Sequence, residues 1–230
     1  MQKIAVSFLL VCMSSLAAAK PADLLVYKVY EQGVEPYISR ILITDQHIRL
    51  DEGAEQGNFT LYNRAEKTVY SIEATGKTIL KLKPMATEVP SNNALILTEE
   101  KQRELDAPKI GDISPLHVEL LANGERCTSM TVAPSLMTNA MSALRELKTT
   151  LALIEADVVA QEGGLFNNAC EMASNLYGAT RTAEHGLPLS ETSGQRQQVL
   201  LDFSEQHEFS SSLFELPKDY RIADPKPLLQ

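Results

Sequence analysis

The side chains best suited to catalysis are scattered along this chain. Its four histidines, at positions 47, 117, 185 and 207, lie far apart, and none has a second ligand at the spacing of a zinc site. His117 and His185 could each meet a carboxylate in space, but isolated histidines are most often ordinary surface or half-buried residues. The histidines therefore predict neither a metal site nor a general base.

Motifs that mark common enzyme classes are also missing from the sequence. It contains no Gly-x-Ser-x-Gly elbow, no His-Glu-x-x-His pair, no Cys-x-x-Cys pair and no Gly-x-x-x-x-Gly-Lys-Ser/Thr phosphate loop. The acidic segment "DEGAEQGN", which begins at Asp51, lacks the spaced ligands of an EF-hand calcium loop. We therefore expect a protein that is not an enzyme and that uses no metal and no cofactor.

The N-terminal segment indicates export from the cytoplasm. Residues 1–19 contain a lysine, an apolar run and the small residues Ala17 to Ala19, which is typical of a secretory signal peptide cleaved after Ala19. We expect a periplasmic protein that retains two cysteines, Cys127 and Cys170. In an oxidising compartment such a pair favours a disulfide, which would stabilise the fold by roughly 4 kcal/mol. Two separately buried thiols are the alternative.

The charge balance argues against anionic polymers as partners. The chain has 21 Lys and Arg residues against 30 Asp and Glu residues, a net charge of −9, and loss of Lys3 with the signal peptide makes it −10. Such a surface repels the phosphates of nucleic acids. We therefore expect no nucleic-acid partner.

The elements that must position any site begin with a run of strands. Residues 24–84 alternate β-branched and aromatic segments with turn residues, which predicts six antiparallel strands with one apolar and one wet face. A short helix is expected over residues 98–106, where Thr98 precedes two glutamates. A hairpin over residues 117–134 turns at Asn123-Gly124, and residues from 187 onward return to strands.

Two helices are expected between these strands. The longer, over residues 135–161, has apolar residues at alternating spacings of three and four, which form one broad stripe. A stripe of this width suits a helix lying on a sheet, and a coiled-coil seam is the alternative. A shorter helix over residues 168–176 would place Cys170 in its first turn. We take five residues of the long stripe as candidate ligand-binding residues: Met137, Leu144, Leu147, Leu151 and Ile154.

The order of these pieces resembles the outer-membrane lipoprotein carrier (LolA-like) superfamily. The resemblance rests on strand phrases such as "RILITDQHIRLD" and "NFTLYNRAEKTVYSI", and on a closing Phe-x-x-Pro-x-x-Tyr motif at Phe214, Pro217 and Tyr220. It implies an incomplete β-barrel of about eight to eleven antiparallel strands, with helices over an apolar cavity. This chain differs in its long helix, its expected disulfide and its acidity.

Two functional hypotheses follow for one α+β domain, residues 20–230, in which two or three helices cover a curved antiparallel sheet. The first is a soluble periplasmic binding module for an apolar ligand such as an acyl chain or a lipoprotein. The second is an envelope module that binds a protein or senses stress and has a filled core. The sequence does not separate them, because the same apolar residues line a cavity and a packed core.

Overall fold

The computed structural model describes residues 19–223, apart from residues 55, 104–107 and 163–165. The predicted signal peptide lies outside this part of the chain, except for Ala19, which is the first residue of the first strand. Export and cleavage therefore stay predictions. Within the described ranges, no helix is both long enough and apolar enough to cross a membrane.

Six antiparallel strands fill the N-terminal third of the chain, as the sequence predicted. Turn residues separate the β-rich segments, so each strand pairs with the one before it. The strands are β1 (Ala19–Glu31), β2 (Val34–Ile43), β3 (His47–Asp51), β4 (Phe59–Asn63), β5 (Thr68–Glu73) and β6 (Thr78–Leu82).

The segment expected to form a short helix is a strand instead. β7 (Leu97–Arg103) pairs with β8 (Leu116–Ala122), from Leu97 opposite Ala122 to Arg103 opposite Leu116. Without β7, the backbone N–H and C=O groups of β8 that point away from β9 would lack partners. The charged side chains of β7 also suit an exposed edge strand. Residues 104–106 of the predicted helix lie outside the described residues.

The predicted hairpin joins β8 to β9 (Glu125–Ala133). Asn123 and Gly124 both have positive φ, 52° and 81°, as a tight two-residue hairpin turn requires. β10 (Leu187–Ser193) pairs with β9, and β11 (Arg196–Ser210) pairs with both β10 and β1. β11 therefore joins the C-terminal strands to the N-terminal ones.

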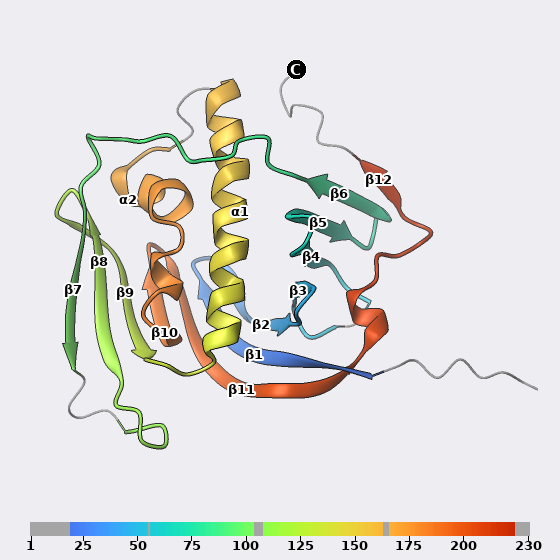
Figure 1. Ribbon diagram of the computed structural model, residues 1–230, viewed down its shortest axis with the longest axis horizontal. Coiled ribbons are helices and arrows are strands. Elements are labelled where there is room, and N and C mark those ends of the chain that lie inside the picture. Colours follow the sequence, from blue (N-terminus) through green and yellow to red (C-terminus); the bar gives the residue numbers. More distant parts are fainter. Residues whose placement is uncertain (1–18, 55, 104–107, 163–165, 224–230) are drawn as a thin grey trace, which may run out of the picture.

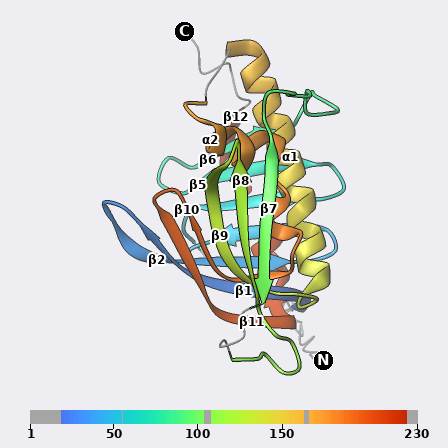
Figure 2. The ribbon, with the colours of Figure 1, turned by 90° about the vertical axis from the view of Figure 1, so that its left-hand side faces the viewer.

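The twelve strands found in the described residues form one open sheet in the order β12-β6-β5-β4-β3-β2-β1-β11-β10-β9-β8-β7. Figure 1 shows it curving around the long helix, with β7–β10 on one side, β2–β6 on the other, and β1 and β11 between. In Figure 2, β7–β9 run nearly along the helix and β1–β2 run across it. The prediction of an α+β fold with an open, curved sheet is confirmed, but the sheet has more strands than the expected eight to eleven.

The long helix is α1 (Thr138–Glu162), close to its predicted bounds. Its N-terminal half packs into an apolar core with β1, β2 and β3; this core includes Leu25, Tyr27, Ile43, Ile48 and Met141. Burial of one broad stripe against the sheet explains why the helix lies inside the curve.

A compact helical segment follows, as predicted, and carries the disulfide. α2 (Ala169–Met172) continues into the π-helical turn η1 (Ala173–Tyr177), and η2 (Arg181–Ala183) is a 3-10 turn. The Asn168 side chain accepts a hydrogen bond from the Glu171 backbone N–H at 2.9 Å, which caps α2. The predicted disulfide is present: Cys127 on β9 is bonded to Cys170 in α2.

The chain from Ser211 onward first packs on the outer face of the sheet, and only its last described residues add a strand. Phe214, the first residue of the closing motif, lies in a 3-10 turn, η3 (Ser211–Phe214). Leu213 and Phe214 are buried against Leu42, Phe59 and neighbouring residues of a second apolar cluster. β12 (Arg221–Ala223) then pairs parallel with β6, which departs from the expected purely antiparallel sheet.

Both faces of the β2–β6 region are therefore covered, and the expectation of one wet face is wrong. On β4, Tyr62 belongs to the core beneath α1, while Phe59 and Leu61 belong to the cluster beneath η3. Arg49 of β3 lies in the outer layer and is 2% exposed; its Nη1 donates to the Leu213 carbonyl at 2.7 Å. The C-terminal segment is thus fixed to the sheet by apolar packing and by a buried cation.

Candidate functional site

The structure separates the five candidate residues of the α1 stripe into three environments. Met137 was expected on the helix, but it lies one residue before α1 with a φ of 52°; it and Leu147 are buried in the core, 2% and 4% exposed. Leu144 and Ile154 are half-buried at the edge of that core. Leu151 is 42% exposed. The N-terminal part of the stripe therefore serves packing, and only its C-terminal part keeps apolar surface accessible.

The C-terminal half of α1 is incompletely covered. Its fully buried apolar residues are the small ones, Ala152 and Ala156, while Ile154 and Val158, on the same side of the helix as Leu151, are only half-buried. Leu151 and Val158 are seven residues apart, so this half-covered stretch runs for roughly 10 Å along the helix. It is an apolar surface at the open end of the curved sheet.

Polar contacts hold α1 against the β3–β6 side of the sheet. The hydroxyls of Tyr62 and Thr150 are 2.8 Å apart and buried. The Arg64 guanidinium donates two hydrogen bonds to Glu146, at 2.7 and 2.9 Å, and this partner lowers the pKa of the Glu146 carboxyl. Farther along, Asp157 accepts hydrogen bonds from the backbone N–H groups of Met85 and Ala86. These contacts fix one side of the helix.

The other side of α1 borders a hollow of about 200 Å³. We call it the basic hollow, because three cationic side chains and one carboxylate line it. β8–β11 form one wall, and the segment from Ala173 to Thr182 forms another. Its polar and charged lining residues are Thr128, Lys148, Ser174, Asn175, Arg181, Thr182, Glu191, Ser193 and Arg196.

Lys148 is the central charge of the basic hollow. It projects from α1 and keeps an intermediate solvent exposure because it lines the hollow, although protein atoms crowd around its ammonium group. Burial lowers the pKa of this ammonium, Glu191 opposes the shift and Arg196 adds to it. Within the described residues, no carboxylate lies within 4.0 Å of the Lys148 ammonium.

The helical segment supplies two further polar groups to the basic hollow. The Thr182 hydroxyl oxygen is buried and has no hydrogen-bond partner among the described residues. The Arg181 guanidinium donates to the backbone carbonyls of Leu121 and Thr98. Carbonyls hold this side chain in place without cancelling its charge, so its positive field reaches the hollow.

The remaining two charges of the basic hollow are held by partners on neighbouring strands. Arg196 Nε lies 3.1 Å from Glu31 Oε1, and Arg196 Nη1 donates to Gln198 at 2.9 Å. The Glu191 carboxylate accepts a hydrogen bond from Gln198 Nε2 at 3.0 Å. Glu191 is thus already engaged, and the hollow keeps an excess of positive charge.

The disulfide fixes the wall of the basic hollow. Cys127 lines it, and the bond to Cys170 attaches the start of the helical segment to β9. Gly178, also in the lining, allows a close approach: an added Cβ would lie 2.8 Å from Arg181 Cδ and 3.1 Å from Leu97 Cδ1. The covalent link and the tight packing keep the donors of this segment in place.

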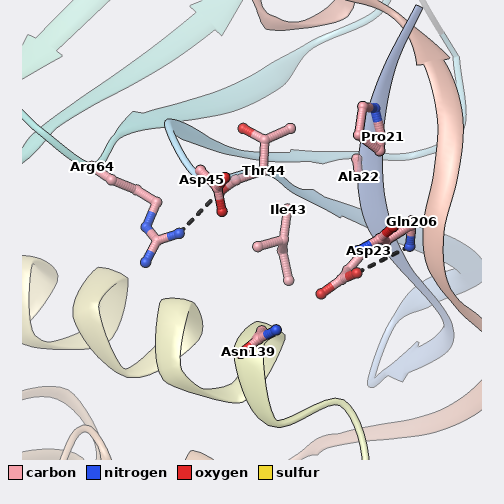
Figure 3. A pocket seen from close by; sticks show the side chains of 9 residues that line it. All are labelled: Pro21, Ala22, Asp23, Ile43, Thr44, Asp45, Arg64, Asn139 and Gln206. Carbon is pink, nitrogen blue, oxygen red and sulfur yellow. Dashed lines mark hydrogen bonds between the residues drawn. The ribbon is translucent and has the colours of Figure 1, made fainter.

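Figure 3 shows a second hollow, of about 130 Å³, near the N-terminal end of α1, with Asp23, Asp45, Arg64, Asn139 and Gln206 around it. Two of its charged groups have partners in the fold: Asp23 accepts from the Gln206 backbone N–H at 3.2 Å, and Arg64 donates to the Thr44 carbonyl and pairs with Glu146. In the part of the chain that the structure describes, no three His, Cys, Asp or Glu side chains are grouped to hold a metal ion.

Two histidines do meet carboxylates, as the sequence allowed. His185 Nε2 lies 3.0 Å from Glu99, and His117 Nε2 lies 3.5 Å from Glu119 and 3.4 Å from the Ser129 hydroxyl. In a catalytic triad the acid holds one ring nitrogen while the other nitrogen faces the nucleophile. Because Glu119 and Ser129 contact the same nitrogen of His117, this group does not have that geometry.

Sequence reasoning missed the basic hollow, since its residues come from four separate segments. One signal was present: Lys148 lies three residues before Leu151 and four after Leu144, so it borders the apolar stripe. A lysine at the edge of a core-facing stripe indicates a charge that the fold must accommodate. Neither of the two hollows described above is lined by any of the five predicted stripe residues.

Comparisons with known proteins give weak likenesses only. No protein-family model and no curated protein matches the chain. Among solved structures it is similar to an uncharacterized conserved protein from Thermus thermophilus, with 11% identity and a TM-score of 0.45 over 89% of this chain and 91% of that one. It is also similar to PNGF-II, with 10% identity and a TM-score of 0.40 over 90% of this chain, which spans 31% of that chain.

Proposed function

We propose that this protein is a non-catalytic binding module of the cell envelope, and that it holds an acyl chain, free or on a lipoprotein, against the C-terminal half of α1. The proposal includes export to the periplasm and a LolA-like ancestry, which the sequence suggested. The observation that carries it is the change in burial along one helix stripe, from Leu147, which is 4% exposed, to Leu151, which is 42% exposed. Water-exposed apolar surface of this kind is stabilised when an apolar ligand covers it.

The position of the exposed stripe favours an acyl chain over other apolar ligands. The half-covered stretch from Leu151 to Val158 is narrow and roughly 10 Å long, which suits an extended hydrocarbon better than a bulky ring system. Lys148 lies one helical turn before Leu151, so a cationic group stands at one end of the apolar stretch. An amphiphile with an anionic head matches this arrangement.

The first test of the acyl-chain proposal uses the protein as it is purified. Mature protein is extracted with organic solvent, the extract is analysed by mass spectrometry, and the delipidated protein is titrated with a fluorescent fatty acid. We expect a co-purifying acyl lipid and saturable binding. Absence of both would contradict the proposal.

Two leucine variants make the test specific to α1. Leu151→Asp places a charge on the apolar stretch, and we expect it to weaken fatty-acid binding by about tenfold or more. Leu201→Asp is the matched control, because Leu201 on β11 is 55% exposed and neighbours Leu200, which packs on the α1 side of the sheet. Equal weakening by both variants would place the ligand elsewhere.

A protein-binding module is the second candidate function. The edge strand β7 supports it, because six of its seven residues are exposed and only β8 pairs with it. An unpaired edge can add a strand from a partner, although the charged side chains of Glu99 to Arg103 disfavour indiscriminate pairing. Capture from an envelope extract, compared between wild type and a variant with proline at Glu100, distinguishes this function. Loss of the captured protein only in the proline variant would favour it.

A further inference from the structure

We propose that the basic hollow binds an anionic group, a phosphate or a carboxylate, whose oxygens accept hydrogen bonds from Lys148 in the field of Arg181 and Arg196. The inference goes beyond the proposed function, since it concerns a site for charge and does not require an acyl chain. Four observations carry it: an ammonium without an ion-pair partner, a hydroxyl without a partner, an excess of cations and a suitable volume.

The first observation is the state of Lys148. Taking an ammonium group out of water is unfavourable unless an opposite charge compensates it. Among the described residues, Lys148 has no ion-pair partner within 4.0 Å, while the carboxylate of the same hollow, Glu191, accepts a hydrogen bond from Gln198. An anion in the hollow would supply the missing counter-charge.

The second observation concerns Thr182 on the facing wall. Its buried hydroxyl has no hydrogen-bond partner in the described part of the chain, which is uncommon for a buried polar group. Thr182 and Lys148 come from different elements and line the same hollow. The wall that faces Lys148 therefore contains a polar group whose hydrogen bond the fold leaves unmade.

The third observation is the charge around this space. Lys148, Arg181 and Arg196 contribute three cations, and among the residues that the structure describes only Arg196 is in a direct ion pair, with Glu31. The hollow is therefore locally positive in a chain whose net charge is −9. A positive concave site within an acidic surface attracts small anions and still disfavours anionic polymers.

The volume of the hollow limits what it can hold. About 200 Å³ is less than the roughly 300–1,000 Å³ of pockets that enclose drug-sized ligands. A single phosphate or carboxylate group fits this space, and a whole lipid does not. A lipid could place its headgroup here only if its acyl chain lay outside, which is where the stretch at Leu151 is exposed.

The experiment measures binding of inorganic phosphate by titration calorimetry and by the rise in Tm, at low and constant chloride. Lys148→Met removes the charge and keeps an unbranched side chain that is one atom shorter, and replacing a partly buried charge by an apolar group does not by itself unfold a protein. We expect wild type to bind phosphate saturably and Lys148→Met to bind it about tenfold or more weakly. Lys148→Met should keep or raise the Tm of the free protein.

The matched control is Lys28→Met. Lys28 is half-buried on β1, between Tyr27 and Val29, which point toward α1, so it lies on the other face of the sheet. We expect its phosphate affinity to equal that of wild type. Thr182→Val, which removes only the hydroxyl, should raise the Tm of the free protein, because an unsatisfied buried donor is lost.

Two further probes distinguish a free anion from a headgroup. A fatty acid and the alcohol of the same chain length are titrated into wild type and Lys148→Met. Fatty-acid binding that weakens in Lys148→Met, with alcohol binding unchanged, identifies a headgroup and supports the site. Phosphate binding that depends on Lys148 supports the site even if neither lipid binds and the acyl-chain proposal fails. If neither phosphate nor fatty-acid affinity depends on Lys148, the hollow holds only water and the inference is overturned.

Discussion

At the scale of single residues, Arg49 and Asp51 form the most buried ion pair among the residues that the structure describes. Arg49 Nε lies 2.6 Å from Asp51 Oδ2, their side chains are 2% and 0% exposed, and the Arg49 guanidinium stacks over the Phe59 ring at 3.7 Å. Burial alone would raise the pKa of the Asp51 carboxyl, but hydrogen bonds from Arg40, Arg49 and the Gly53 backbone outweigh it, so this pKa lies below its ordinary value of 3.8.

The depressed pKa of Asp51 predicts how stability depends on pH. A carboxyl whose pKa is lower in the folded state contributes its full stabilisation above the ordinary value of 3.8, and this contribution is lost as the pH falls through the folded value. At neutral pH we expect Asp51→Asn to lower the free energy of unfolding by roughly 3–5 kcal/mol, because it removes a buried carboxylate that both Arg40 and Arg49 contact.

Urea unfolding of wild type and Asp51→Asn between neutral pH and pH 2 measures this dependence. The difference in the free energy of unfolding should shrink steadily below the ordinary value of 3.8. Asp219→Asn is the control, since Asp219 pairs with Lys77 where both side chains are exposed. A constant difference for Asp51→Asn across the pH range would show that the charge of Asp51 does not stabilise the fold.

At the scale of elements, the disulfide joins the helical segment to β9. Cys127 and Cys170 are 43 residues apart in the sequence, and closing a loop of that length stabilises a fold by about 4 kcal/mol in the chain-entropy model. We expect Cys127→Ala and Cys170→Ala to lower the free energy of unfolding equally, by about this amount. Reductant should destabilise wild type and leave both variants unchanged. Unequal losses in urea unfolding would indicate separate roles for the two cysteines.

Gly186 marks the close approach of β10 to β9. Its φ is +121°, and an added Cβ would lie 2.3 Å from the Ala133 carbonyl oxygen, just before Leu187 pairs with Ala133. We expect Gly186→Ala to lower the free energy of unfolding by about 2 kcal/mol or more, through backbone strain and a steric clash.

The control for Gly186 is Gly194 in the next turn. It also has positive φ, +58°, but no atom lies within 4 Å of its added Cβ. Gly194→Ala should therefore cost only about 1 kcal/mol, the backbone term alone. Thermal melts compare the two variants. If both lose the same stability, the approach of β10 to Ala133 relaxes without cost.

At the scale of the whole molecule, the single sheet predicts one folding unit. β1 pairs with β2 on one side and with β11 on the other, so the N-terminal and C-terminal strands are continuous through one ladder. We expect one cooperative unfolding transition, with coincident curves from backbone circular dichroism and from tyrosine fluorescence. Two separated transitions would contradict the prediction of a single domain.

The sequence by itself determined the local elements of this protein. The hairpin at Asn123-Gly124, the bounds of α1 and the cap at Asn168 follow from turn geometry, apolar spacing and side-chain hydrogen bonds, all of which act between near neighbours in the chain. The disulfide was also predictable, because only two cysteines remain after the predicted signal peptide is set aside.

Only the tertiary structure decided the features that depend on partners distant in the chain. Residues 98–103 have a local preference for helix, but pairing with β8 supplies backbone hydrogen bonds along the segment and makes it a strand. Phe214 turns onto the outer face of the sheet because a second apolar cluster lies there. The basic hollow arises in the same way: Lys148, Arg181, Thr182 and Arg196 meet only when the sheet curves around α1, and no local pattern encodes that curvature.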